Sequence, residues 1–376
     1  MTGSALPRPL PFEGVEELEG RPHVVVDGGA RPSTVLSLSH WPGSVTPRAL
    51  ARDLSAEIAF AYLRSPGYWR DDAEAVTNDH VDQDGLVSIY VLSHPGPALD
   101  HEHVLVEVAR VGDFAVERDD AALAISLALR ELADAARGAR IDAGSPAGRR
   151  AETAALLDEL VGRLPELLRD PERARALCAA ELAAVDAGRR ALAAGDVTVE
   201  GPGQAGVATV VVDERVQPVA ASRFFDAIRA PVHPVVVHSA TDAVRVLLAH
   251  GRHYRYYDRY ETWVRFTSAQ LPRRRALPPL AEMLDAEESG GARWRADPPG
   301  ALEPSLEVEG ESSIELSRLG ELISSYLLDA PVAWDPDARS GALAGASVSG
   351  PGAPRAGTTG RGRLRSRGRR RERPSA

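Results

Sequence analysis

Residue types that bind metal ions are concentrated in one short segment, residues 78–85, with the sequence NDHVDQDG. His80, Asp82 and Asp84 alternate along it, and alternation places side chains on one side of an extended segment. Imidazole and carboxylate ligands without a thiolate suit Mn²⁺ or Mg²⁺, with Zn²⁺ and Fe²⁺ as alternatives. We therefore predict that the three side chains bind one divalent ion, or two ions that share a carboxylate. The competing interpretation is a hydrogen-bonded or calcium-like loop, in which Asn78 caps the turn.

Three more candidate metal ligands each follow an apolar segment that we expect to be a strand. The expected strands comprise residues 23–26, 34–38 and 103–111, and the candidates after them are Asp27, His40 and Asp113. Polar residues at the carboxyl ends of strands in α/β proteins gather in the crevice that binds ligands. The alternative roles are local, namely a turn at Asp27 and stacking on Trp41 for His40.

The sequence HVDQDGLVS at residues 80–88 resembles the first motif, H-x-D-x-D-G-x-x-S, of the DHH phosphoesterase superfamily. Members of that superfamily are metal-dependent phosphohydrolases and nucleases, in which the histidine and both aspartates of the motif bind manganese. The resemblance implies that His80, Asp82 and Asp84 are the catalytic metal ligands and that the cofactor is one or two Mn²⁺ ions, with Mg²⁺ as the alternative. It also implies a DHH-like parallel sheet, in which Asp27 and His40 fill equivalent positions by a rearranged strand order.

The family's later Asp-His-His motif is absent from this chain. Its nearest approximation is Asp-His-Glu-His at residues 100–103, which follows the first motif much sooner than in the family and which we expect to be an exposed loop. Gly-Asp at residues 112–113 is similar to a later family element. The resemblance therefore supports the fold and the metal more than the substrate.

The pattern of apolar residues predicts an α/β protein with two domains and a tail. We expect a DHH-like metal-binding α/β domain with a helical segment over residues 1–200, a smaller C-terminal α/β domain over 201–338 and a disordered, arginine-rich tail over 339–376. Further expected strands are 75–77, 207–212 and 234–238. Expected helices run from Thr46 toward Leu63, and over 86–92, 120–137, 147–194 and 241–250.

The C-terminal domain contains a stretch in which basic residues and tyrosines interleave. The basic residues are Arg252, His253, Arg255 and Arg259. Guanidinium groups bind phosphate oxygens and aromatic rings stack on bases, so we predict that these four residues bind substrate. The alternative is an amphipathic segment with tyrosines inward and arginines outward.

Composition narrows the function classes. The chain has no lysine, so all 44 of its basic residues other than histidine are arginine, which excludes a Walker A phosphate loop and Schiff-base chemistry. Its one cysteine, Cys178, permits no disulfide, and we expect it to be a small buried apolar residue. Because no apolar run approaches a membrane span and the first residues do not resemble a secretory signal, we expect a cytoplasmic protein without membrane contact.

Two functions remain open at this point, with a third that concerns the tail. The first is a metal-dependent phosphoesterase acting on a phosphorylated small molecule or nucleotide. The second is a non-catalytic DHH-like protein that binds a nucleotide or a protein partner, which the missing Asp-His-His motif favours. The formal net charge is −10, whereas residues 361–376 carry eight arginines and one glutamate, so the tail could attract nucleic acid weakly.

Overall fold

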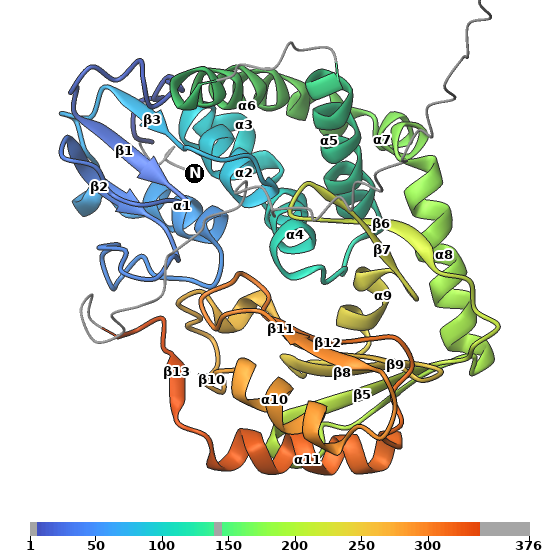
Figure 1. The fold of residues 1–376 in the computed structure, drawn as a ribbon. Helices are drawn as coiled ribbons and strands as arrows, with labels where there is room; N and C mark the ends of the chain where they lie inside the picture. Colours follow the sequence, from blue (N-terminus) through green and yellow to red (C-terminus); the bar gives the residue numbers. More distant parts are fainter. Residues whose placement is uncertain (1–5, 139–144, 339–376) are drawn as a thin grey trace, which may run out of the picture.

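The computed structural model describes residues 6–138 and 145–338 as a mixed α/β fold (Figure 1). The α/β class expected from the sequence is confirmed. The expected disordered tail, residues 339–376, lies outside the described residues. Within the described ranges, no helix has both the length and the apolar composition needed to cross a membrane.

A small parallel sheet forms near the N-terminus. It contains β1 (His23–Val26), β2 (Thr34–Leu38) and β3 (Ala75–Thr77) in the order β2-β1-β3, with β1 paired in parallel to both neighbours. All four residues of β1 are buried, as is usual for the central strand of a parallel sheet covered on both faces. The strands expected at 23–26, 34–38 and 75–77 are therefore confirmed.

A group of helices packs beside this sheet. They are α1 (Ser55–Leu63), α2 (Gln83–Ser93), α3 (Pro95–Asp100), α4 (Glu102–Phe114), α5 (Asp120–Gly138), α6 (Pro146–Arg169), α7 (Pro171–Leu177) and α8 (Ala179–Ala194). Helix α2 is the innermost, because its residues from 83 to 92 are all buried and it contacts α1, α4 and α6. The helices expected over 86–92, 120–137 and 147–194 are confirmed.

Five sequence-based assignments were wrong. Residues 100–103, which were expected to form an exposed loop, lie where α3 ends and α4 begins. Residues 102–114 form a helix rather than a strand, because the buried residues Leu105, Val108 and Val111 recur at helical spacing although valine is β-branched. Helix α1 begins at Ser55 rather than near Thr46, whose hydroxyl instead donates to the Ser39 carbonyl at 2.8 Å.

The other two errors lie close together in the C-terminal half. Residues 234–239 form helix α9 (Pro234–Ser239), with proline in its first turn, and residues 245–250 form strand β8 (Arg245–His250). A short apolar run does not distinguish a buried strand from a buried helix by periodicity alone. Here tertiary packing decides, since β8 is a central strand of the larger sheet.

The larger sheet has six strands in the order β11-β12-β9-β8-β5-β4. They are β4 (Val197–Glu200), β5 (Val207–Val212), β8, β9 (His253–Asp258), β11 (Arg293–Ala296) and β12 (Ser305–Glu309), and only the β5–β8 pair is parallel. Helices α10 (Pro278–Glu287) and α11 (Leu316–Asp329) pack with residues of this sheet in one apolar cluster. The domain division expected after residue 200 stays a prediction, and β4, on its N-terminal side, pairs with β5.

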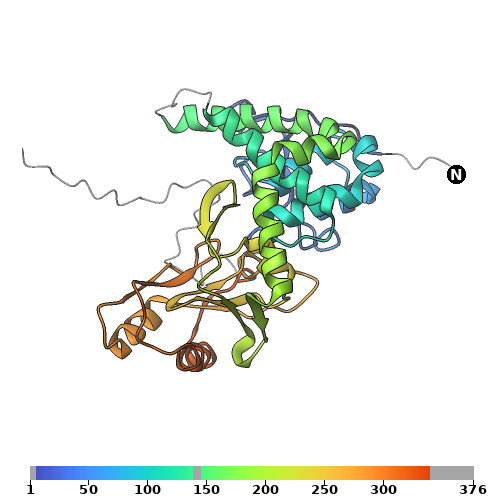
Figure 2. The same ribbon diagram turned by 90° about the vertical axis from the view of Figure 1, so that its right-hand side faces the viewer.

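A hairpin and a two-stranded ribbon complete the fold. The hairpin consists of β6 (Val219–Arg223) and β7 (Asp226–Ala230), and the ribbon of β10 (Arg274–Arg275) and β13 (Val332–Trp334). The hairpin projects from the six-stranded sheet toward the helices of the N-terminal half, as the yellow segment in Figure 2 shows. One apolar core cluster runs from the N-terminal sheet to residues of β5, β8 and β13, so the two halves share a core.

Candidate metal centre

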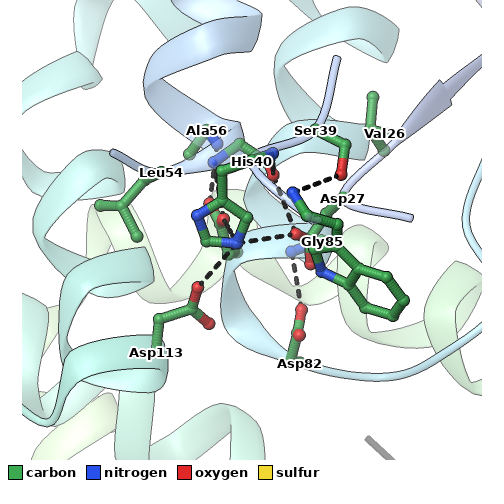
Figure 3. Close-up of polar contacts among 12 residues, drawn as sticks. Val26, Asp27, Ser39, His40, Leu54, Ala56, Asp82, Gly85 and Asp113 are labelled. Carbon is green, nitrogen blue, oxygen red and sulfur yellow. Dashed lines mark hydrogen bonds and ion pairs between the residues drawn. The ribbon is translucent and has the colours of Figure 1, made fainter. Parts of the chain in front are cut away.

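Six buried histidine and aspartate side chains meet at the carboxyl edge of the parallel sheet. Figure 3 labels four of them, Asp27, His40, Asp82 and Asp113. Five of them follow β1, β2 and β3, where parallel strands direct their ends to the same edge. The sixth, Asp113, comes from the last turn of α4. Their exposed fractions lie between 0 and 5% for Asp27, His40, His80, Asp82, Asp84 and Asp113.

Asp27 lies between two groups of candidate ligands. Its Oδ1 is 3.3 Å from Nε2 of His40, and its Oδ2 is 3.2 Å from Nε2 of His80. We call Asp27, His40, Asp84 and Asp113 the His40 group, and Asp27, His80 and Asp82 the His80 group. Asp27, His40 and Asp84 offer ligand atoms within 4.8 Å of one another, and so do the three residues of the His80 group. One carboxylate is therefore shared by two sets of donors.

Each histidine is oriented through its other ring nitrogen. Nδ1 of His40 donates to the main-chain carbonyl of Asp53 at 2.5 Å, and Nδ1 of His80 faces Oδ1 of Asp79 at 3.3 Å. A carbonyl only accepts hydrogen bonds, so Nδ1 of His40 carries a proton, and Nε2 presents a lone pair when it is deprotonated. Histidines that bind metals are held in this way by an acceptor on the far nitrogen.

The carboxylates are positioned by main-chain donors. Asp84 accepts hydrogen bonds from the amides of Ser55 and Ala56, both 2.7 Å long, at the N-terminus of α1, where the helix dipole favours negative charge. Asp82 is the N-cap of α2, and its Oδ1 accepts from the amide of Gly85 at 2.7 Å. The capping leaves Oδ2 of Asp82 directed at His80.

Asn78 and Gly85 fix the turn that carries these ligands. The Asn78 amide donates to the carbonyls of Val26 and Asp27, at 3.2 and 3.4 Å, and its oxygen accepts from the amide of His80 at 2.8 Å. The asparagine therefore joins the end of β1 to the acidic turn. A side chain at position 85 would collide with the Asn78 amide and approach Oδ1 of Asp82 to 2.9 Å, so only glycine fits there.

The electrostatics of the cluster favour added positive charge. Burial opposes an imidazolium at His40, but contact with Asp27 and the charge of Asp84 outweigh it and raise its pKa to about 9. Burial and the charge of Asp27 raise the pKa of Asp84 to about 8. The pKa of Asp113 lies well above its usual range because of burial and the charges of its neighbours. Burial alone would raise the pKa of Asp27, yet contacts with both histidines outweigh it and lower that pKa. A bound cation meets the same demand.

Two atoms of the His40 group have no hydrogen-bond partner among the described residues, although both are buried. They are Nε2 of His40 and Oδ2 of Asp113, which lie 3.5 Å apart. Buried polar atoms without partners are rare, and each calls for an explanation such as a bound ion. Their position among carboxylate oxygens fits a divalent cation, and the oxygen and imidazole donors suit Mn²⁺ or Mg²⁺.

The structure thus brings together all six residues that the sequence singled out as metal ligands. Their proximity is an observation, whereas their role as ligands stays a prediction. Asp113 reaches the cluster from a helix and not from the strand end that we expected. Of the other downstream candidates, His103 is on the surface of α4, where its side chain is 75% exposed.

The residues expected to bind substrate have other partners. Arg252 pairs with Glu315 and Arg255 with Glu307, while His253 is exposed at the start of β9. Arg259 is buried and donates to main-chain carbonyls and to Glu261. Among their described contacts none is with the six-residue cluster, and their role in substrate binding stays a prediction.

Sequence reasoning missed the residues that orient the ligands. Asp79 lies inside the acidic segment and its position beside His80 was an available signal. No pattern in the sequence pointed to the main chain of Asp53, to Ser55 or to Arg223, because these residues meet the cluster only through the tertiary fold.

Comparison with known proteins adds the family. The sequence model of a family of unknown function (DUF6687) matches residues 8–338, so the chain belongs to that family. No curated protein and no solved structure matches the chain closely enough to indicate a relationship.

Proposed function

We propose that this member of the DUF6687 family is a metal-dependent phosphoesterase that hydrolyses a phosphoester or phosphodiester at the six-residue cluster. The observation that carries the proposal is Asp27, whose two carboxylate oxygens face separate sets of donors. A carboxylate shared in this manner is the usual bridge between two divalent ions in hydrolytic sites. The similarity of residues 80–88 to the DHH first motif supports the same reaction class.

The roles of the residues follow from their positions. His40, Asp84 and Asp113 would hold one ion and His80 and Asp82 the other, with Asp27 common to both. Two Mn²⁺ or Mg²⁺ ions would activate a water molecule and stabilise the charge of the attacked phosphate. The chain's own contribution is to fix the donors, through the Asp53 carbonyl and the Asp79 carboxylate behind the histidines and the α1 amides behind Asp84.

The test is turnover of a chromogenic phosphodiester together with metal content. We expect hydrolysis of bis(p-nitrophenyl) phosphate, or of cyclic dinucleotides or short single strands, that needs Mn²⁺ and stops on chelation. Asp27→Ala should abolish activity, since it removes the shared ligand. His103→Ala removes an exposed histidine from the helix that carries Asp113, and it should retain full activity. Activity that survives in Asp27→Ala would refute the assignment.

The burial of the cluster favours a second candidate, a non-catalytic DHH-like protein that binds a nucleotide or a protein partner. Substrate must reach side chains of which none is more than 5% exposed. Tightly bound metal without turnover on the whole substrate panel would support this second function over the first. Protein without metal, whose stability Mn²⁺ does not change, would exclude the phosphoesterase and leave the non-catalytic function.

The remaining parts of the proposal concern substrate contacts and location. Arg252, His253, Arg255 and Arg259 are proposed to bind the phosphorylated substrate. Arg252→Ala and Arg255→Ala should then raise KM while leaving kcat nearly unchanged. We also propose a cytoplasmic location, which fractionation of cells with an antibody against the protein would test.

A further inference from the structure

The hairpin β6–β7 contacts the C-terminal end of α4, the helix that supplies Asp113. Arg223, which is 8% exposed, donates from Nη1 to the Gly112 carbonyl at 2.7 Å and from Nη2 to the Asp113 carbonyl at 2.5 Å. These carbonyls belong to the last turn of α4, where the helix itself leaves acceptors unpaired. Glu303 accepts from Nε of Arg223 at 3.0 Å and so holds the guanidinium in place.

The turn of this hairpin has an unusual backbone. Phe224 and Phe225, its two central residues, have φ values of +50° and +61°, a region that asparagine and glycine normally occupy in such turns. Bulky residues persist there only when their surroundings impose the conformation. Phe224 lies beneath the Arg223 guanidinium, 3.7 Å from ring centre to Cζ, and the Phe225 carbonyl accepts from Arg137 at 3.3 Å. Contacts with Arg223 and Arg137 therefore hold the turn of the hairpin beside the end of α4.

A second contact from the C-terminal half reaches His40. The amide of Arg265 donates to the His40 carbonyl at 2.8 Å. Asp53, whose carbonyl orients the His40 ring, accepts with its side chain from the amides of Thr267 and Ser268 at 2.7 and 2.9 Å. Residues 265–268 thus brace both His40 and the residue that orients it.

The His80 group is oriented differently. The polar contacts described for His80 and Asp82 come from residues of the N-terminal half, namely Asp27, Asn78, Asp79 and Gly85. Asp79 in turn pairs with Arg31 at 2.9 Å. The two groups therefore share Asp27 but differ in which half of the chain supports them.

We infer that the C-terminal half sets the metal affinity of the His40 group alone. Its positioning residues are Arg223 and residues 265–268, which act on His40 directly and by way of Asp53, and the His80 group is independent of these contacts. The inference rests on the proposed metal centre. It adds that the binding of one ion, at the His40 group, depends on the C-terminal half of the chain, whereas the binding of the other does not. It follows from geometry, since Arg223 and residues 265–268 fix the main chain of Asp113 and His40 without offering a ligand atom themselves.

The test measures Mn²⁺ binding to the full-length protein by counting free ions with electron paramagnetic resonance. The His80→Ala variant reports the His40 group and the His40→Ala variant reports the His80 group. Arg223→Met should weaken Mn²⁺ binding about 10- to 100-fold in the His80→Ala background, the range found when a group that orients a ligand is removed. In the His40→Ala background the same change should leave the dissociation constant within about 2-fold, because the described contacts of Arg223 reach Asp113 and none reaches His80, Asp82 or Asp27.

Matched variants separate positioning from general damage to the fold. Arg137→Met removes another contact with the hairpin but none with Asp113, and it should leave both dissociation constants unchanged. Asp53→Ala keeps the hairpin intact and should weaken the His40 group as Arg223→Met does, so it decides the matter if the Arg223 variant is unfolded. Equal weakening of both groups by Arg223→Met and Asp53→Ala, or no effect of either, overturns the inference. A wild-type protein that binds no Mn²⁺ would instead refute the proposed metal centre.

Discussion

Binding of Mn²⁺ should raise the thermal stability of the protein by an amount that the cluster allows us to work out. An ion present at about 100 times its dissociation constant stabilises the folded state by about 2.7 kcal/mol. Two ions, one in each group, would together contribute about 5 kcal/mol under the same condition. The described part of the chain has roughly 330 residues, for which the entropy of unfolding is about 0.7 kcal/mol per kelvin. The expected increase in Tm is therefore about 8 °C.

Scanning calorimetry of chelator-treated protein, with and without added Mn²⁺, measures this shift. His80→Ala leaves only the His40 group and should show about half of it. Asp27→Asn removes the carboxylate that both groups share and should show none. His103→Ala serves as the control for adventitious binding to an exposed histidine and should behave as the wild type. An unchanged Tm of the wild type with Mn²⁺, Mg²⁺ and Zn²⁺, or a shift that persists in Asp27→Asn, would refute the reasoning.

Three further predictions concern pH, the turn and the cysteine. The pKa values of His40 and Asp84 are raised to about 9 and about 8, so both groups stabilise the folded state at low pH and lose that contribution as the pH rises through these values. Metal-free protein should therefore become less stable to urea between pH 6.5 and 9. Over the same range Mn²⁺ binding should tighten, because the ligands must be deprotonated. A urea midpoint that does not change with pH would contradict this. Gly85→Ala forces a methyl group against Asn78 and should cost about 1 to 3 kcal/mol in urea unfolding, and an unchanged midpoint would count against the turn geometry. Cys178 is 1% exposed and burial raises its pKa to about 12, so native protein should not react with a thiol reagent until it is unfolded, and rapid labelling would show the packing to be wrong.

The sequence was sufficient to predict the N-terminal sheet and the members of the cluster. A buried parallel strand leaves a clear pattern, in which a short apolar run ends at a polar residue, and Asp27 and His40 both stand at such an end. The acidic turn was recognisable because its residue types alternate and a glycine follows. Strand ends of a parallel sheet then meet at one edge by geometry, which is why the prediction of proximity succeeded.

What could not be predicted depends on contacts between distant segments. Asp113 was expected to follow a strand because valines recur before it, although Val108 and Val111 lie on the buried face of α4. The order of α9 and β8 was reversed because each is a short apolar run whose environment decides its conformation. The role of Arg223 lay beyond reach, since an arginine far along the chain gives no local sign that it will donate to α4.

The bracing of His40 and Asp113 by residues 223 and 265–268 has a consequence for how the protein is made. All six candidate ligands lie between residues 27 and 113, so they leave the ribosome before Arg223 and residues 265–268 do. Arg223 and residues 265–268, which support the His40 position, are synthesised more than a hundred residues after Asp113. The proposed metal centre would then form in order during translation, with the His80 position ready first and the His40 position completed only when residues 223 and 265–268 dock.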